Sequence, residues 1–382
     1  MAAVEDTTVQ VTFEAPPGVL QVRAGRQSQL IEHGGGPGSV VIEDLAPRER
    51  VLIELRHGRA ANSRQVAART LASPPGAQLS RVATISDLHL GSRVHGLART
   101  MMDRSGLADP APLRCARGAI GESTAWGAQV LVGKGDLTQN GWAAEWHQLG
   151  GLLDRYAKGV VRLGLPGNHD TPRRRNIEPA AGLGRAGFPS AGLTSGEPEW
   201  HDLDGVRVVA ADSTVEHEAW GTLSRHHDAV LDLAVDAARS GRAVLLCLHH
   251  PLERAPVQLQ YPRGVPWAEG RRFARRLAQA NPRCLITAGH THRNRRRRVG
   301  PVLHTEVAST KDWPGVWAGY AVHEGGIRQV VRRIAAADAM GWIDYTRWAA
   351  GGLWWFYSPG RLSDRCFTYR WPTRSTRSTR ST

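Results

Sequence analysis

From Arg81 onward, short apolar runs alternate with stretches that have the periodicity of helices, and this alternation constrains the fold more than any other feature. The apolar runs, in chain order, are RVATIS, AQVLVGKG, VVRLGLPG, VRVVAADS, AVLLCLHH and CLITAGH. The helix-like stretches cover residues 113–127, 142–157, 224–240 and 268–280. Strands that alternate with helices predict an α/β domain whose strands are mostly buried on both faces.

Three further parts surround this α/β domain, which we place at residues 79–334. Residues 1–72 contain short alternating runs and a glycine-rich loop, which predict a small, sandwich-like all-β N-terminal module, followed by a linker at 71–78. Residues 335–372 are rich in tryptophan but interrupted by charges, which favours a surface-packed C-terminal cap over a membrane anchor. Residues 373–382 repeat Thr-Arg-Ser and predict a disordered basic tail.

Composition narrows the class of protein and its compartment. Hydrophobic residues make up 41% of the chain, which excludes wholesale disorder. The net charge of +14 comes almost entirely from arginine, as in proteins of GC-rich bacterial genomes, so it is weak evidence for a nucleic-acid partner. Four cysteines form no CxxC pair, and Cys247 and Cys284 lie in apolar runs, as buried free thiols do. Without a signal-like N-terminus or a run of about 18 apolar residues, we expect a cytoplasmic protein with no membrane partner.

Five of the apolar runs end in residues that can bind metal ions. In chain order these residues are Asp87 and His89, then Asp136, then Asn168 before His169 and Asp170, then His249 and His250, and finally His290 and His292. Loops that follow strand C-termini build the sites of α/β sheets. An i, i+2 spacing in an extended segment also lets both side chains face one ion. Oxygen and nitrogen donors without thiolate suit Mn, Fe or Zn. Seven of these residues form such a mixed set, which fits two ions that share a bridging carboxylate: Asp87, His89, Asp136, Asn168, His249, His290 and His292.

The ordered series DxH, GD, GNHD, HHP and GHTH resembles the calcineurin-like metallophosphoesterase superfamily over about residues 81–333. The resemblance implies a four-layer α/β/β/α sandwich. It also implies the metal ligands, motif by motif. The first ion would be held by Asp87, His89 and His292, the second by Asn168, His249 and His290, and Asp136 would bridge them.

The same resemblance implies hydrolysis of a phosphoester by a hydroxide that bridges the two ions and attacks phosphorus in line. Asp136 would take part as the bridge, and His169 matches the histidine that contacts the phosphate or leaving group. His250 would lie outside the ligand set. Gln139 stands where purple acid phosphatases carry a tyrosinate ligand.

Several segments are most similar to the bacterial cyclic-nucleotide-phosphodiesterase-like branch. They are GDLTQNG, the Asp212-Ser213 strand end, the HHP block, and residues 306–310 and 312–314. We therefore expect a small phosphodiester substrate, 3′,5′-cyclic nucleotides included. A nuclease or phosphomonoesterase of the same superfamily is one alternative. A non-enzymatic binding module on a phosphoesterase scaffold is another, and the sequence leaves the oligomeric state open.

The remaining basic and aromatic residues receive plainer interpretations. We expect Arg295–Arg298 to form a solvated turn before the strand VGPVLHTEV. For Arg293 two interpretations stay open with equal weight: it steers substrate, or it belongs to that turn. Arg173–Arg175 are treated in the same way, and the tryptophans of the cap are expected to pack. The tail should give only weak, non-specific nucleic-acid binding. Histidines outside the motifs are expected to have no role in the site: His95, His147, His201, His217, His226, His227, His304 and His323.

Overall fold

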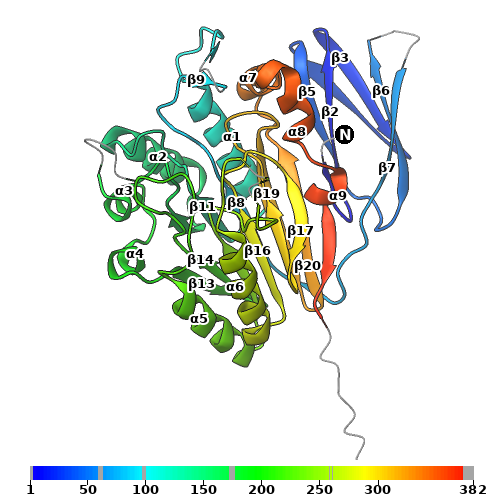
Figure 1. Cartoon of the computed structure of the whole chain (residues 1–382). Coiled ribbons are helices and arrows are strands. Elements are labelled where there is room, and N and C mark those ends of the chain that lie inside the picture. The colour runs from blue at the N-terminus through cyan, green and yellow to red at the C-terminus, as the bar shows by residue number, and fades with distance from the viewer. Residues whose placement is uncertain are drawn as a thin grey trace, which may run out of the picture.

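The computed structural model describes residues 3–372 except 59–62, 97–99, 172–176, 258 and 260. Its centre is a pair of six-stranded mixed sheets (Figure 1). The first sheet has the order β12 (Val161–Leu165), β11 (Val130–Lys134), β8 (Gln78–Ile85), β19 (Val316–His323), β20 (Gly326–Arg333) and β21 (Phe367–Arg370). The second has the order β13 (Glu199–Leu203), β14 (Val206–Ala210), β15 (Ala243–Cys247), β16 (Cys284–Ala288), β18 (Val302–Glu306) and β17 (Arg295–Val299).

Helices cover the outer faces of both sheets. The first sheet is covered by α1 (Ala111–Ala125), α2 (Ala143–Tyr156), α3 (Pro179–Arg185) and α7 (Ala337–Thr346). The second is covered by α5 (His227–Arg239) and α6 (Trp267–Ala280). Neighbouring residues of a strand enter different layers: Val130 and Val132 pack between the sheets, whereas Leu131 packs under the helices. These four layers confirm the predicted α/β/β/α fold.

The four predicted helices agree with the structure to within a few residues, because each has one apolar face. In α6 the buried residues Gly270, Phe273, Ala274 and Leu277 follow the i, i+3, i+4, i+7 spacing. The central strands are buried along their whole length, as in β15 and β16. Shorter elements had no sequence signal: α4 (Ala191–Ser195), β9 (Val94–His95), β10 (Met101–Met102), and α3 and β13.

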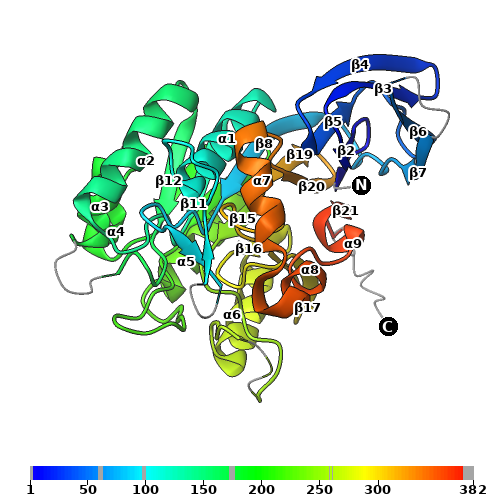
Figure 2. The same cartoon turned by 90° about the horizontal axis from the view of Figure 1, so that it is seen from above.

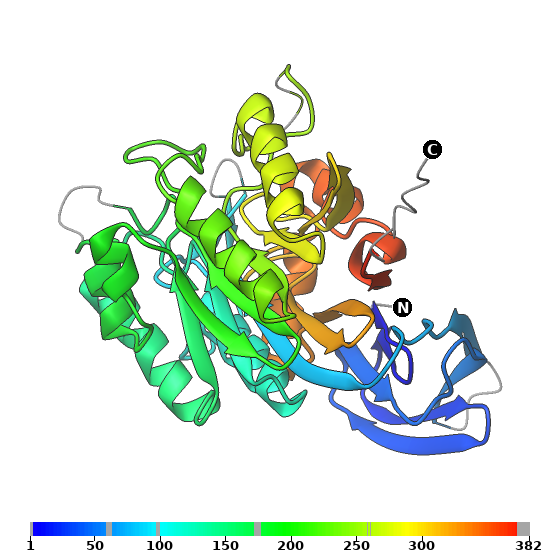
Figure 3. The same ribbon diagram turned by 90° about the horizontal axis from the view of Figure 1, so that it is seen from below.

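The N-terminal part is all-β, as predicted, and its two antiparallel sheets enclose a small core of their own. One contains β1 (Ala3–Val4), β2 (Val9–Ala15) and β5 (Gly36–Ile42). The other contains β4 (Gln27–His33), β3 (Gly18–Ala24), β6 (Arg50–His57) and β7 (Ser63–Arg69). This part lies beside β19 and β20 (Figure 3), and the Arg328 guanidinium on β20 donates to the Glu5 carboxylate at 2.9 Å.

The C-terminal segment returns to the first sheet. After α7 come a 3-10 turn η1 (Ala349–Gly352), α8 (Leu353–Tyr357) and α9 (Leu362–Arg365), and then β21 pairs antiparallel with β20. The limits at 72, 79, 334 and 372 stay predictions, and the tail 373–382 and Arg173–Arg175 lie outside the described residues. Among the residues that the structure describes, no helix is both long and apolar enough to cross a membrane.

Candidate metal centre

The loops after β8, β11, β12, β15 and β16 meet at one edge of the two sheets, and the seven predicted metal ligands lie on them. Four overlapping groups of side chains have donor atoms within 4.8 Å of one another. The groups are Asp87, His89 and His292; His89, Asp136 and His169; Asp87, Asp136 and His249; and His249, His250 and His290. The Asn168 Oδ1 atom joins them at 3.3 Å from His249 Nε2. The edge where parallel strands end therefore gathers the whole predicted set.

The backbone of this edge is bent into an unusual conformation. Five predicted ligands have left-handed φ angles: Asp87 (55°), His89 (46°), Asp136 (49°), His290 (69°) and His292 (49°). This region is disfavoured for residues with a Cβ atom, and such strain concentrates at functional sites. Hydrogen bonds between the loops hold it in place, among them Asp87 N to Gly135 O at 3.0 Å.

Two glycines, Gly167 and Gly289, allow these loops to approach closely. A Cβ atom on Gly167 would lie 2.3 Å from the backbone nitrogen of Asp136, and one on Gly289 would lie 2.7 Å from Asp87 Oδ2. Both distances are too short for any other residue. The loop before Asn168 can therefore pack directly on Asp136, and the loop before His290 directly on Asp87.

The donor atoms are spaced for cations shared between them. Asp136 Oδ2 lies 3.6 Å from His89 Nε2 and 3.4 Å from His249 Nε2, and so faces both predicted ligand sets. His292 Nε2 lies 3.4 Å from Asp87 Oδ1 and also 3.4 Å from His89 Nε2. Ring nitrogens this close, with buried carboxylates beside them, are paired more favourably by a metal ion than by each other. The residues present fit a metal pair.

Outer hydrogen bonds fix which ring nitrogen faces the centre. The Nδ1 atom of His249 lies 2.9 Å from Lys134 O, and that of His292 lies 2.8 Å from Asp312 Oδ2. Each contact leaves Nε2 for the centre, the usual arrangement around metal-binding imidazoles. Burial opposes the charged imidazolium, but Asp312 and Asp87 together raise the pKa of His292 to about 10. The carboxylates thus create a site that favours positive charge.

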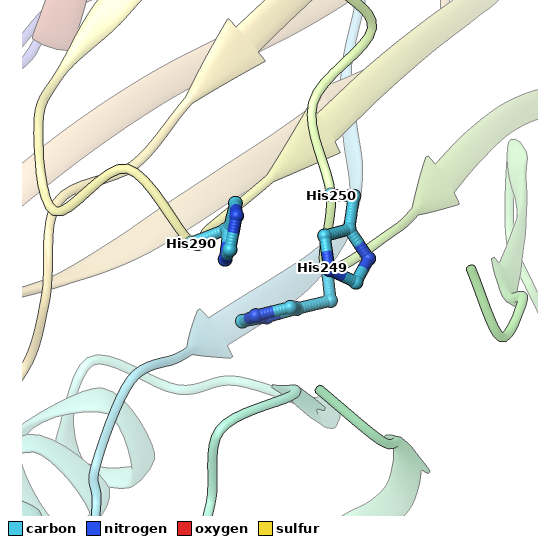
Figure 4. Close-up of side chains that lie close together, drawn as sticks. All are labelled: His249, His250 and His290. Atoms are coloured by element: carbon cyan, nitrogen blue, oxygen red, sulfur yellow. The ribbon is translucent and has the colours of Figure 1, made fainter. Parts of the chain in front are cut away.

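His250 lies closer to the centre than the sequence suggested. Its ring centroid is 4.5 Å from that of His290 and 4.8 Å from that of His249, and Figure 4 shows the three together. Its Nδ1 atom lies 3.0 Å from Ser213 Oγ, and its buried Nε2 atom has no hydrogen-bond partner among the residues that the structure describes. Geometry alone therefore leaves both histidines of the HHP block as candidate ligands, and the choice of His249 stays a prediction.

His169 stands at the wall of the centre. Its backbone N–H donates to Asp136 Oδ1 at 2.8 Å, and its Nδ1 atom lies 3.1 Å from the carbonyl oxygen of Gln139. Its ring is 4.6 Å from that of His89. These contacts fix the ring beside Asp136 while leaving Nε2 outside them.

The centre opens into a cavity of about 590 Å³. Predicted ligands and His169 form one side of it: His89, Asp136, Asn168, His290 and His292. Polar, basic and aromatic side chains from distant parts of the chain also line it: Arg93, His95, Gln139, Tyr261, Lys311 and Trp354. A substrate in this cavity would touch donor groups as well as aromatic and basic groups.

The family model for the calcineurin-like phosphoesterases matches residues 80–294, more than half of the chain. The chain belongs to this family. The superfamily resemblance of the five motifs is thereby confirmed, and the phosphoesterase has a buried His/Asp metal-binding site.

Solved structures with low sequence identity are similar to this phosphoesterase. Purple acid phosphatase PPD1 from yellow lupin (Lupinus luteus) seeds is 13% identical, with a TM-score of 0.46 over 87% of this chain and 71% of that chain. PhoD is 9% identical, with a TM-score of 0.43 over 86% of this chain and 85% of that chain. Phosphopantetheinyl hydrolase from Mycobacterium tuberculosis is 15% identical, with a TM-score of 0.38 over 62% of this chain and 92% of that chain. No curated protein sequence matches the chain.

Sequence reasoning missed a group of residues around Asp312. The buried Asp312 Oδ2 atom contacts His292, and also His95 Nδ1 at 3.5 Å, while Trp354 Nε1 donates to Asp312 Oδ1 at 3.4 Å. His95 was expected to have no role and Trp354 only to pack, yet both line the cavity. The position of Asp312 shortly after β18, at the same sheet edge, is a signal that could have been used. His95 and Trp354 carry no such signal.

Replacing Asp312 with Asn should weaken metal binding by about 10- to 100-fold, since outer partners of metal-binding histidines have effects of this size. The neutral amide still offers an acceptor to His292 Nδ1 but no longer a negative charge. Competition with a chelator measures the change. Asp202→Asn is the matched control, because Asp202 pairs with Arg207, away from the cavity. Equal metal affinities in the two variants would contradict the role of Asp312.

The arginine stretch was wrongly interpreted as a solvated turn. Residues 295–299 form the edge strand β17, which pairs antiparallel with β18. Alternate arginines point to one side, where Arg293, Arg295 and Arg297 lie 3.1, 3.8 and 3.4 Å from the buried carboxylate of Glu306. Arg293 is buried and stacks 4.8 Å from the Tyr357 ring centroid, so its charge is engaged inside the protein instead of steering substrate.

Replacing Glu306 with Ala should lower the free energy of unfolding at pH 7 by about 3–5 kcal/mol, because it leaves buried arginines without a counter-charge. Burial opposes ionisation, but the arginines hold the pKa of Glu306 at about 2. Since this pKa is lower than in the unfolded chain, the stabilisation is complete above about pH 4.5 and is lost as the pH falls toward 2. Denaturant titration of both proteins between about pH 7 and pH 2 measures this pH dependence of the free energy of unfolding. Glu218→Ala, at an exposed site, should change little.

Proposed function

We propose that this phosphoesterase hydrolyses phosphodiesters, 3′,5′-cyclic nucleotides included, at a centre of two metal ions. The observation that carries the proposal is the position of Asp136, whose Oδ2 atom faces histidines of both predicted ligand sets at the wall of one cavity. Trp354 and Tyr261 in the same cavity support a substrate with an aromatic group such as a nucleobase. The motifs of the bacterial cyclic-nucleotide-phosphodiesterase-like branch support a diester.

We assign the ligands as the motifs suggest. Asp87, His89 and His292 would hold one ion, Asn168, His249 and His290 the other, and Asp136 both. Mn, Fe and Zn all accept this mixture of oxygen and nitrogen donors. When bound, such ions polarise phosphoryl oxygens and lower the pKa of water toward neutrality.

His169 is proposed to act on the leaving group. Its Nδ1 contact with Gln139 O orients the ring, and Nε2 is left to donate a proton to the departing oxygen. A positioned general acid contributes about 10²- to 10⁴-fold to the rate. The backbone contact of His169 with Asp136 keeps this acid next to the metal centre.

Elemental analysis followed by a substrate panel tests the proposal. We expect two ions per chain and faster hydrolysis of bis(p-nitrophenyl) phosphate and cyclic nucleotides than of p-nitrophenyl phosphate or single-stranded DNA. Faster release from the monoester would make the protein a phosphomonoesterase. A fully metal-loaded protein that hydrolyses none of these compounds would favour a binding module.

Truncation after Pro372 should leave the rate on bis(p-nitrophenyl) phosphate unchanged, because the residues of the proposed site and of its cavity lie between 87 and 354. The truncation removes Arg374, Arg377 and Arg380, so weak nucleic-acid binding should largely disappear. Specific DNA cleavage that persists after truncation would point to a nuclease. The DNA-binding constant of such a nuclease should fall steeply with salt, since log K decreases by about 0.9 per phosphate contact for each tenfold rise in salt concentration on duplex DNA.

A further inference from the structure

Two surface segments carry large apolar side chains that are exposed. On α8, Leu353 is 68% exposed and Phe356 is 81% exposed; in the segment before α6, Leu259 is 72% exposed and Tyr261 is 73% exposed. We define the apolar rim as Val257, Leu259, Tyr261, Leu353, Trp355 and Phe356. Figure 2 shows α8 at the surface beside β17. Clusters of this kind on a protein surface mark interaction sites.

The apolar rim reaches the cavity of the metal centre through Tyr261, whereas Val257 and Leu259 line a separate cavity with Arg254 and Arg295. Tyr261 itself lines the cavity, and so does Trp354, which stands between Leu353 and Trp355 in the chain. Residues of the two segments thus meet around one opening, although about 90 positions separate them in the sequence. A partner that covers Tyr261 and α8 therefore also faces the metal centre.

Two exposed arginines, Arg93 and Arg254, lie near the rim in the cavity lining or in the sequence. Arg93 is exposed and lines the cavity, and the exposed Arg254 lies three residues before Val257. Within the part of the chain that the structure describes, neither arginine has an ion-pair partner. A third arginine, Arg347, stacks 5.4 Å from the Trp355 ring centroid, but its charge is paired with Asp344 at 3.5 Å. Exposed aromatic and aliphatic side chains beside free arginines complement a surface that is apolar within and negatively charged outside.

We propose that the apolar rim docks this phosphoesterase onto an anionic lipid surface, with the cavity facing the headgroups. A second copy of the chain bound to the rim would cover the opening, whereas a lipid surface presents phosphoesters to it. The orientation of the cavity rests on the proposed function, since it gives the metal centre a lipid phosphoester to act on. Docking itself depends only on the rim and its charges.

Sedimentation of the metal-loaded full chain with vesicles tests the docking. We expect binding to phosphatidylcholine vesicles that contain phosphatidylglycerol, weaker binding at about 0.5 M salt, and little binding to pure phosphatidylcholine. The double variant L353S/F356S should reduce affinity for the anionic vesicles at least roughly tenfold. Its metal content and its rate on bis(p-nitrophenyl) phosphate should match those of the unaltered chain, because neither residue lines the cavity.

The matched control is L30S/L52S, since Leu30 and Leu52 are exposed leucines of the N-terminal sheet, and it should bind vesicles normally. No binding of the unaltered chain to anionic vesicles would overturn the proposal. So would a dimer in analytical ultracentrifugation that L353S/F356S dissociates, because the occupant would then be a second copy. If vesicle binding responds as expected but no phosphodiester is hydrolysed, the docking stands and the proposed reaction is wrong.

Discussion

Replacing Asp136 with Asn is expected to remove at least one metal ion from the chain and to reduce turnover by more than about 100-fold. Substitutions of residues that only hydrogen-bond to a metal ligand already reduce metal affinity or activity 10- to 100-fold. Asp136 faces both predicted ligand sets directly, so a larger effect is expected. Burial disfavours its ionised form, yet His249 and its neighbours keep the pKa of Asp136 well below its usual range. The carboxylate is thus charged at neutral pH, and the neutral amide removes the charge that both ions share.

Elemental analysis and the rate on bis(p-nitrophenyl) phosphate, measured on the same sample, check this expectation. Asp154→Asn provides the matched control, because Asp154 is exposed and pairs with Arg162, away from the cavity. The control should keep both ions and its turnover. An Asp136→Asn protein with two ions per chain and ordinary turnover would show that Asp136 does not bridge.

Replacing His249 or His169 with Ala should have opposite effects on metal content. His249→Ala should lose the second ion, because the wild-type Nε2 atom lies within 3.4 Å of both Asp136 Oδ2 and Asn168 Oδ1. His169→Ala should keep both ions and lose about 10²- to 10⁴-fold in turnover, the contribution of a general acid. The difference separates a ligand from a group that acts on the leaving oxygen.

Metal content per chain and turnover are measured for both variants, with His147→Ala, at an exposed position on α2, as the control. A parallel His250→Ala variant decides which histidine of the HHP block binds metal, since His250 also lies near His290. Loss of metal from the His169 variant, or full occupancy in the His249 variant, would reverse the roles. Loss of metal from the His250 variant alone would identify His250, instead of His249, as the ligand.

The sequence by itself determined the α/β architecture and the set of residues that meet in the metal centre. Strands buried on both faces appear as continuous apolar runs, and helices with one buried face show a 3.6-residue period, so both are local patterns. The candidate ligands could be named because parallel strands end at a common edge, which makes positions after five runs neighbours in space, and because their motifs resemble those of the family. Asp87 and Asp136, which lie on different loops, could therefore be placed in one centre from the sequence.

The tertiary structure alone decided contacts that no local pattern records. Arg297 belongs to an edge strand because the buried Glu306 on the neighbouring strand neutralises it, and a run of arginines has no strand signal of its own. Trp354 reaches the cavity because the segment after β20 folds back over the edge of the sheets. This segment contains α8, and it brings the indole of Trp354 to Asp312. Such contacts depend on where distant segments pack, and a sequence read locally contains only the spacing within each segment.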